Sequence, residues 1–252
     1  MEASLDVASM AETSTKVFIF EVMGRHAGWM AAAGSLARVD KNDAPHIILF
    51  PEIVFDEKKF LMQIKKIVKD NGYCVIVASE GVKNKKGKFL AESDRKDAFG
   101  HSQLGGVAPF LSNLINKKLK LKNHWAVSDY LQRSARHIAS KTDLAQAEAV
   151  GTYAVKNAVK GMNGVMPVIK RGSGKKYSWR IEPASLSKIA NVEKKLPKSY
   201  ISKDGFDVTK KAIDYLHPLI LGEAFPKFSN GLPASNKLKL QMVVKKLKSW
   251  DV

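Results

Sequence analysis

Two short glycine turns combine charged side chains with backbone freedom. The first, Met23-Gly24-Arg25, follows an apolar run and precedes a stretch with helical spacing. A guanidinium beside a helix amino terminus makes a compact anion site, because both donate hydrogen bonds to negative oxygens. The second turn, Ser79-Glu80-Gly81, supplies an acid that can accept hydrogen bonds from a polyol. Each turn alone is common, but two at the strand ends of one sheet favour a ligand site.

A third cluster, Tyr130 to His137, carries two of the chain's seven arginines three positions apart. Tyr130 lies three residues before Arg133, and Arg136 follows three residues after it. Residues at this spacing share one face only if the segment is helical. The cluster therefore predicts either a binding group for an anion or a solvated basic surface.

Other kinds of catalytic site find no support in the sequence. Cys74 lies inside an apolar run, which is typical of a buried and inert thiol. A serine nucleophile elbow, a P-loop and a G-x-G-x-x-G fingerprint are all lacking. The histidines show none of the spacing with cysteines or acids that predicts a metal site; they are His26, His46, His101, His124, His137 and His217.

The composition is that of a globular protein. The 252 residues are 45% apolar and 26% charged, which is enough to bury a core. A single cysteine excludes a disulfide scaffold, and no run reaches the ~18 apolar residues of a membrane helix. The amino terminus lacks the basic and apolar regions of a signal peptide, so the cytoplasm is the expected location.

The net charge of +18 raises the question of a nucleic-acid partner. Only seven of the 42 basic residues are arginine. Proteins that bind nucleic acid typically rely on arginine, because its planar guanidinium forms bidentate hydrogen bonds to phosphates and to guanine edges. The lysines are spread over the whole chain, including 83–88, 117–122, 194–198 and 237–248. A solvated lysine-rich surface is favoured, and a basic polyanion-binding protein remains the alternative.

The elements that must hold the two turns are strands and helices in alternation. Residues 17–22, 46–50 and 73–79 are nearly continuous runs rich in β-branched and aromatic residues, typical of strands buried on both faces. Helical spacing over 27–38 and 56–70 separates them. Strand, helix, strand, helix, strand predicts an α/β protein with a parallel sheet.

Beyond the third strand the pattern is weaker. Residues 83–102 read as a long loop, and helices are expected over 107–118 and 144–160. Thr142-Asp143 opens the second of these helices, with Gln146 completing a capping box. Strands are expected over 165–170 and 177–181, and a lysine-rich tail with short helical pieces follows from residue 186. A helix over residues 2–12 begins without a cap, as though the chain started inside a larger domain.

Four motifs together resemble the phosphofructokinase family in order and spacing, over roughly residues 2–170. The resemblance is to the pyrophosphate-dependent bacterial branch, because ATP-dependent members typically have His where Tyr130 stands and Gly-Gly where Ser134-Ala135 stand. The motifs are Glu21-Val-Met-Gly-Arg-His-Ala-Gly28, Ala78-Ser-Glu-Gly81, Asp97-Ala-Phe-Gly-His101 with Gln103-Leu-Gly-Gly106, and Tyr130-Leu-Gln-Arg-Ser-Ala-Arg136.

The resemblance implies fructose 6-phosphate as the acceptor and assigns residues to it. Met23, Gly24 and Arg25 match the family's substrate loop, in which the arginine also faces the transferred phosphoryl group. Glu80 matches the acid that holds sugar hydroxyls. Tyr130 and Arg133 match the pair that grips the 6-phosphate.

Two further positions fall near the places where many relatives present basic residues across a subunit interface. These are Lys16 and His124, and neither is the arginine typical of the family. The resemblance also implies a homo-oligomer. No membrane partner is expected because no apolar run is long enough, and the small share of arginine disfavours nucleic acid.

The family's donor half has no counterpart in this sequence. That half supplies a glycine-rich donor loop, an acidic Mg2+ site and a Thr-x-Asp-x-Asp segment with the catalytic base. The expected fold is therefore an N-terminally truncated sugar-phosphate domain with Rossmann-like layers. Its expected divisions are 1–128 for fructose 6-phosphate binding, 129–172 returning to the donor domain, and 173–252 as a lysine-rich tail.

The expected activity is phosphoryl transfer from pyrophosphate to fructose 6-phosphate, giving the glycolytic product fructose 1,6-bisphosphate. This chain would carry the acceptor-binding half, be inactive alone, and depend on Mg2+ bound by the other half. A catalytically incomplete sugar-phosphate-binding module is the alternative of another class.

Overall fold

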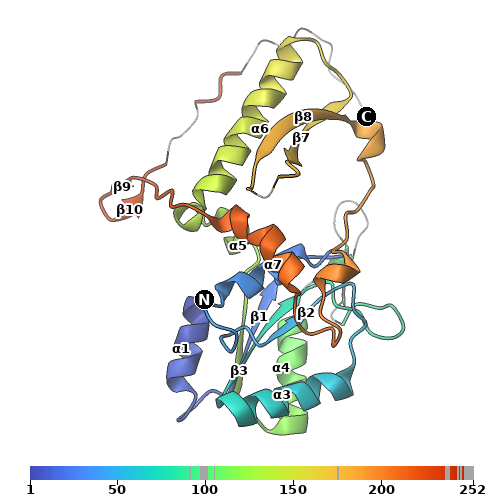
Figure 1. The fold of residues 1–252 in the computed structure, drawn as a ribbon, viewed down its shortest axis with the longest axis vertical. Coiled ribbons are helices and arrows are strands. Elements are labelled where there is room, and N and C mark those ends of the chain that lie inside the picture. Colours follow the sequence, from blue (N-terminus) through green and yellow to red (C-terminus); the bar gives the residue numbers. More distant parts are fainter. Residues whose placement is uncertain are drawn as a thin grey trace.

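A four-stranded parallel sheet with the order β2-β3-β1-β6 lies at the centre of residues 1–128 (Figure 1). In this computed structural model the described residues are 1–90, 92–96, 102–104, 106–174, 176–235, 239–242, 244 and 246. The three apolar runs form strands as predicted, and each strand is largely buried. The strands are β1 (Val17–Val22), β2 (Ile47–Leu49), β3 (Cys74–Ser79) and β6 (Asn123–Val127).

The fourth strand, β6, is missing from the sequence-based expectations. It pairs with β1 at the edge of the sheet, and Trp125 within it is 47% exposed. An edge strand needs no continuous apolar run, because one side and part of its faces meet solvent. Asn-His-Trp-Ala-Val therefore shows no strong strand pattern.

Helices cover both faces of the sheet. On one face, α3 (Glu57–Asn71) and α4 (Val107–Leu119) bury apolar side chains against β1 and β3. Asp56 caps α3 by accepting from the Lys59 amide, and Gly72 ends it in the left-handed conformation. The helices predicted over 56–70 and 107–118 are thus confirmed.

The other face of the sheet is covered by α2 (Trp29–Ala33) and by a segment from the far end of the chain. The predicted helix over 27–38 forms as α2 followed by a 3-10 turn, η1 (Gly34–Ala37). Ala31 and Ala32 pack with Phe50 and with apolar residues of the segment 196–216, which includes α7 (Lys210–Leu216). Part of the lysine-rich tail therefore belongs to the hydrophobic core, because its apolar residues pack on this face of the sheet.

A second group of elements stands beyond the carboxyl edge of the sheet (Figure 1). The long helix α6 (Lys141–Val159) packs against the antiparallel hairpin of β7 (Val165–Arg171) and β8 (Trp179–Ser185). These elements agree with the expected helix and strands. The predicted capping box is wrong: Ser140 caps α6 by accepting from the Asp143 amide, and Gln146 is buried and bonds to the Tyr177 hydroxyl.

The remaining elements are short. The loop predicted over 83–102 is wrong where β4 and β5 form an antiparallel pair. In the described part of the chain no helix has the length and apolar character to cross a bilayer. The short elements are α1 (Glu2–Met10), β4 (Glu92–Lys96), β5 (Ser102–Leu104), α5 (Leu131–Ser134), η2 (Arg136–Ile138), η3 (Leu186–Lys188), η4 (Lys198–Tyr200), η5 (His217–Ile220), β9 (Phe228–Ser229) and β10 (Leu232–Pro233).

Candidate functional site

The two glycine turns leave the sheet side by side. Val22 of β1 pairs with Ser79 of β3, so the residues that follow them emerge at neighbouring points of the carboxyl edge. The Gly24 amide donates to Glu80 Oε1 at 3.1 Å, and Ser79 Oγ donates to the Gly24 carbonyl at 2.6 Å. The arginine turn and the acidic turn are therefore joined directly, through backbone groups of one and side chains of the other.

Glycine is required at two points of this junction. Gly24 has φ +148°, and a Cβ there would lie 2.6 Å from Ser79 Oγ. A Cβ at Gly81 would lie 1.9 Å from the Arg25 carbonyl oxygen. An added Cβ would collide with the Ser79 side chain at Gly24 and with backbone atoms at Gly81, which explains why both turns carry glycine.

The third cluster lies beside the first. Tyr130 is the N-cap residue of α5, a single turn, and the Arg133 guanidinium carbon lies 4.6 Å from the centre of the Tyr130 ring. Both side chains are exposed. Gln132, between them, accepts a hydrogen bond from the Met23 amide at 3.1 Å. The sequence-predicted residues Met23, Gly24, Arg25, Glu80, Tyr130 and Arg133 thus belong to one connected group of turns.

Arg136 is separated from this group by a break in the helix. Ala135 leaves the helical conformation, with φ −87° and ψ 60°, and a separate 3-10 turn follows. Arg136 Nη1 donates to the Ala224 carbonyl. The two arginines of the cluster therefore do not share one continuous helix face.

Lys16 and His124 lie toward the opposite edge of the sheet. Lys16 precedes the first residue of β1, and its Nζ donates to the Ala11 carbonyl. His124 is exposed in β6, level with Phe18 near the start of β1. The structure does not bring either residue to the group of turns, and a contact across a subunit interface stays a prediction for both.

Glu21 is a buried acid next to the site that sequence reasoning did not single out. It is 2% exposed, and its carboxylate accepts from the Gly106 amide at 3.1 Å and the Ala108 amide at 2.8 Å, at the start of α4. Burial raises the pKa of this carboxyl, the backbone hydrogen bonds oppose that rise, and the nearby Glu80 charge adds to it. An acid inside an otherwise apolar strand was the available signal.

The start of α2, directly after Arg25, is held by two distant parts of the chain. Gly28 at its amino end has no side chain to cap it, and Glu52 accepts from the Gly28 amide at 3.0 Å and from the Leu196 amide at 2.8 Å. Trp29 Nε1 donates to the Lys194 carbonyl at 2.7 Å, and His26 pairs with Glu193. Residues 193–196 of the predicted tail therefore clamp the arginine turn, and no local pattern signals such contacts.

An open cleft borders the third cluster. Its volume is about 1180 Å3, and its walls come from α5, η2, the start of α6 and the segment after η5. Its lining includes Gln132, Arg133 and Arg136, together with Glu223 and Phe225. The two arginines give the cleft the cationic groups that an anionic ligand requires.

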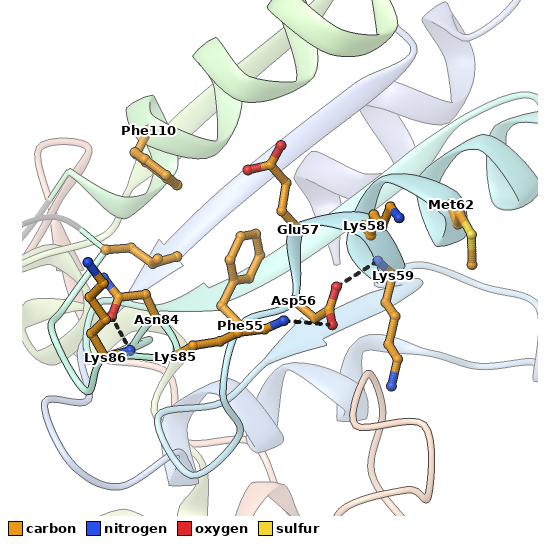
Figure 2. Close-up of a pocket in the computed structure, with 11 residues that line it drawn as sticks. Phe55, Asp56, Glu57, Lys58, Lys59, Met62, Asn84, Lys85, Lys86 and Phe110 are labelled. Carbon is orange, nitrogen blue, oxygen red and sulfur yellow. Dashed lines mark hydrogen bonds and ion pairs between the residues drawn. The ribbon is translucent and has the colours of Figure 1, made fainter.

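A second hollow, of about 790 Å3, is shown in Figure 2. None of the sequence-predicted site residues lines it. Asp56 accepts from the Lys59 amide at 3.1 Å and lies 3.8 Å from Lys85 Nζ, and Asn84 accepts from the Lys86 amide at 2.9 Å. The side chains of Asp56 and Asn84 are thus occupied in a helix cap and a turn.

Metal-ligating residues do not gather within the described residues, where no three His, Cys, Asp or Glu side chains could hold an ion. Cys74 is fully buried, and burial raises the pKa of its thiol. The motif segment Asp97 to His101 lies outside the described residues.

Comparison with known proteins gives consistent matches. Residues 1–158 match the family described as Phosphofructokinase. The chain is 56% identical over 252 residues to pyrophosphate–fructose 6-phosphate 1-phosphotransferase of Halomonas elongata, a match that covers 100% of this chain and 60% of that protein. The enzyme of the same name from Xanthomonas campestris is 55% identical, with 99% and 60% covered.

Two solved structures show the same fold. The pyrophosphate-dependent phosphofructokinase of Marinobacter aquaeolei superposes with a TM-score of 0.85 at 53% identity, covering 98% of this chain and 58% of that one. The protein from Nitrosospira multiformis gives 0.87 at 51% identity, covering 99% and 59%. The chain thus spans about 60% of the length of the curated relatives it matches.

Proposed function

The chain belongs to the phosphofructokinase family, and we propose that it forms the acceptor-binding part of a pyrophosphate-dependent transferase. In the reaction, the 1-hydroxyl oxygen of fructose 6-phosphate bonds to a phosphorus of pyrophosphate as the bridging P–O bond breaks. The products are fructose 1,6-bisphosphate and phosphate, and the hydroxyl proton passes to a base. The names of the relatives from Halomonas elongata and Xanthomonas campestris support this activity.

One observation carries the proposal for this chain: three chemically different turns converge at one sheet edge. Hydrogen bonds from the Met23 and Gly24 amides join the arginine turn to the Tyr130–Arg133 turn and to Glu80. A sugar phosphate needs a cation for its phosphate and an acid for its hydroxyls, and this group of turns offers both.

We assign the roles as follows. Arg25 faces the transferred phosphoryl group, where a guanidinium stabilises the charge that develops in the transition state. Glu80 already accepts from the Gly24 amide through Oε1, and its second oxygen accepts from a sugar hydroxyl. Tyr130 and Arg133, stacked on each other and exposed, bind the 6-phosphate.

Pyrophosphate, the catalytic base and Mg2+ are proposed to be held outside the residues described above. When bound, Mg2+ would neutralise charge on the donor phosphate, and no step assigned to this chain runs through it. A homo-oligomer, a place in glycolysis and a cytoplasmic location remain predictions, as do the roles of Lys16 and His124.

Two alternatives make different predictions. A sugar-phosphate-binding module would bind fructose 6-phosphate without turnover, even when joined to the remaining length of the Halomonas elongata relative. A polyanion-binding protein, suggested by the net charge of +18, would bind nucleic acid with an affinity that falls steeply as salt increases.

Titration of fructose 6-phosphate and of fructose into the chain tests the binding role. Arg133→Ala should weaken fructose 6-phosphate binding about 10- to 100-fold, the effect of losing a hydrogen bond to a charged group, and should leave fructose binding unchanged. Arg180→Ala is the matched control, because Arg180 is an exposed arginine of β8 paired with Glu182. An equal loss of affinity for fructose 6-phosphate and for fructose would mean that the variant is misfolded. An unchanged affinity for fructose 6-phosphate would refute the assignment of Arg133.

A further inference from the structure

Gln132 joins the Tyr130–Arg133 turn directly to the arginine turn through a hydrogen bond. The Met23 amide donates to Gln132 Oε1 at 3.1 Å, across 109 positions of sequence. Gln132 is half-buried and lies in the chain between the exposed residues Tyr130 and Arg133, directly before Arg133. The residue therefore lies between the group proposed to bind the 6-phosphate and the loop that carries Arg25.

The hydrogen-bonding partners determine which way the Gln132 amide points. The Met23 group is an N–H, which can only donate, so the atom facing it must be the oxygen of the Gln132 amide. Ser128 Oγ lies 2.9 Å from the same oxygen and must then be the donor. The Ser128 hydroxyl also lies 3.1 Å from the Glu21 carbonyl oxygen, so its single hydrogen is shared between two acceptors, whereas the Met23 amide donates to Gln132 Oε1.

The position of Met23 explains why a side chain is needed there. In a parallel ladder the amide and carbonyl of one residue face the same neighbouring strand, and successive residues alternate sides. The Glu21 carbonyl faces the β6 side, where it accepts from Ser128, and the Val22 carbonyl faces β3, where it accepts from Glu80. Met23 faces the β6 side again, but β6 has ended at Val127. The Gln132 side chain takes the place of the next residue of that strand.

We propose that Gln132 is a positioning residue that couples the phosphate-binding turn to the arginine turn, and so sets the placement of Met23, Gly24 and Arg25 against the sugar phosphate. This inference rests on the proposed function, since it assigns the two turns to one ligand. Gln132 acts through the Met23 amide and not by contact with the reacting atoms. Its loss should release the Met23 amide and weaken sugar-phosphate binding together.

The test combines hydrogen exchange of the Met23 amide, followed by NMR, with titration of fructose 6-phosphate. Gln132→Leu keeps the size of the side chain but removes the acceptor oxygen. It should speed exchange at Met23 by at least about tenfold and weaken fructose 6-phosphate binding by about tenfold. Gln132→Glu keeps an acceptor oxygen at the same reach and should restore slow exchange at Met23. Gln63→Leu, on α3, should change neither measurement.

Each contrary result has a distinct meaning. Unchanged exchange at Met23 in Gln132→Leu would show that the hydrogen bond does not hold the loop, and would overturn the inference. Faster exchange at Met23 with unchanged affinity for fructose 6-phosphate would show that the Met23–Gln132 hydrogen bond exists but does not affect ligand binding. This result would also overturn the inference. If the unaltered chain bound no sugar phosphate, the proposed function and the coupling would both fail, while the exchange result would still decide whether Gln132 holds Met23.

Discussion

Arg25 occupies the position where one charge should matter most for catalysis. It follows two residues whose amides are fixed by Gln132 and Glu80, and it precedes a helix start held by Glu52. A cation placed on a constrained backbone costs little reorganisation when charge develops on a phosphoryl group.

Arg25→Ala should therefore lower turnover by ~10³-fold and alter fructose 6-phosphate affinity much less. The measurement couples fructose 1,6-bisphosphate formation to NADH oxidation, with pyrophosphate and Mg2+ present. It is made on the chain alone and on the chain joined to the remaining length of the Halomonas elongata relative. Turnover matching that of the Arg180→Ala control would exclude contact with the transferred group.

His46, far from the site, should make stability depend on pH. Its Nδ1 accepts from the Val75 amide at 3.0 Å, so the hydrogen of the neutral ring is on Nε2, which is buried without a partner among the described residues. Burial, aided by the Arg38 charge and opposed by Asp43, lowers the pKa of His46 from 6.5 to about 4. Protonation in the folded state is therefore costly.

The pKa of His46 makes the folded protein less stable as the pH falls. A base whose folded pKa is depressed contributes stability that is present above pH 6.5 and is lost as pH falls toward about 4. The unfolding free energy should drop by roughly 1–2 kcal/mol between about pH 7 and 4.5, allowing for partial exposure of the ring. His46→Gln should flatten this part of the profile in urea titrations, and His217→Gln, at an exposed position, should not. Identical slopes for all three proteins would argue against His46.

At the scale of elements, short structures in this site are held by side chains from elsewhere. α2 has five residues and α5 has four, too few to be stable as isolated helices. Glu52 at the start of α2 and Gln132 in α5 each bind backbone amides of another segment. The geometry of the site thus depends on long-range polar contacts more than on helix propensity.

Glu52→Ala should loosen α2 and the arginine turn together, because the Gly28 and Leu196 amides both lose their acceptor. Leaving such groups unpaired typically costs about 1–3 kcal/mol each where they are buried. We expect lower resistance to urea and faster exchange of the Gly28 amide. Glu148→Ala, an exposed acid of α6, is the control. A loss of stability no larger than that of this control would contradict the clamp.

At the scale of the molecule, the described residues leave large apolar side chains exposed to solvent. Val155 and Val159, four positions apart on α6, are 64% and 83% exposed. Exposed apolar surface of this extent favours association.

The chain studied alone should therefore self-associate, with a mass above 27.8 kDa in light scattering coupled to size exclusion. Val155→Ser with Val159→Ser on α6 should reduce the association, because both positions are exposed. Met62→Ser is the control, because Met62 is an exposed apolar residue on a different helix, α3. A constant monomer mass over the whole concentration range would refute the prediction.

The sequence by itself determined the parallel sheet and the two turns at its edge. Runs such as 17–22 and 73–79 are apolar on both faces, and such strands are stable only when helices cover both sides. Once β1 and β3 are parallel neighbours, Arg25 and Glu80 must emerge close together. Family motifs added the Tyr130–Arg133 pair.

Only the tertiary structure decided which side chains hold these turns in place. The Met23–Gln132 bond spans 109 residues and the Leu196–Glu52 bond spans 144. A polar side chain carries no local pattern that names its distant partner, because hydrogen bonding is satisfied by whichever group the fold brings near. For the same reason β6, an edge strand without an apolar run, and the packing of residues 196–216 on the sheet emerged only from the folded chain.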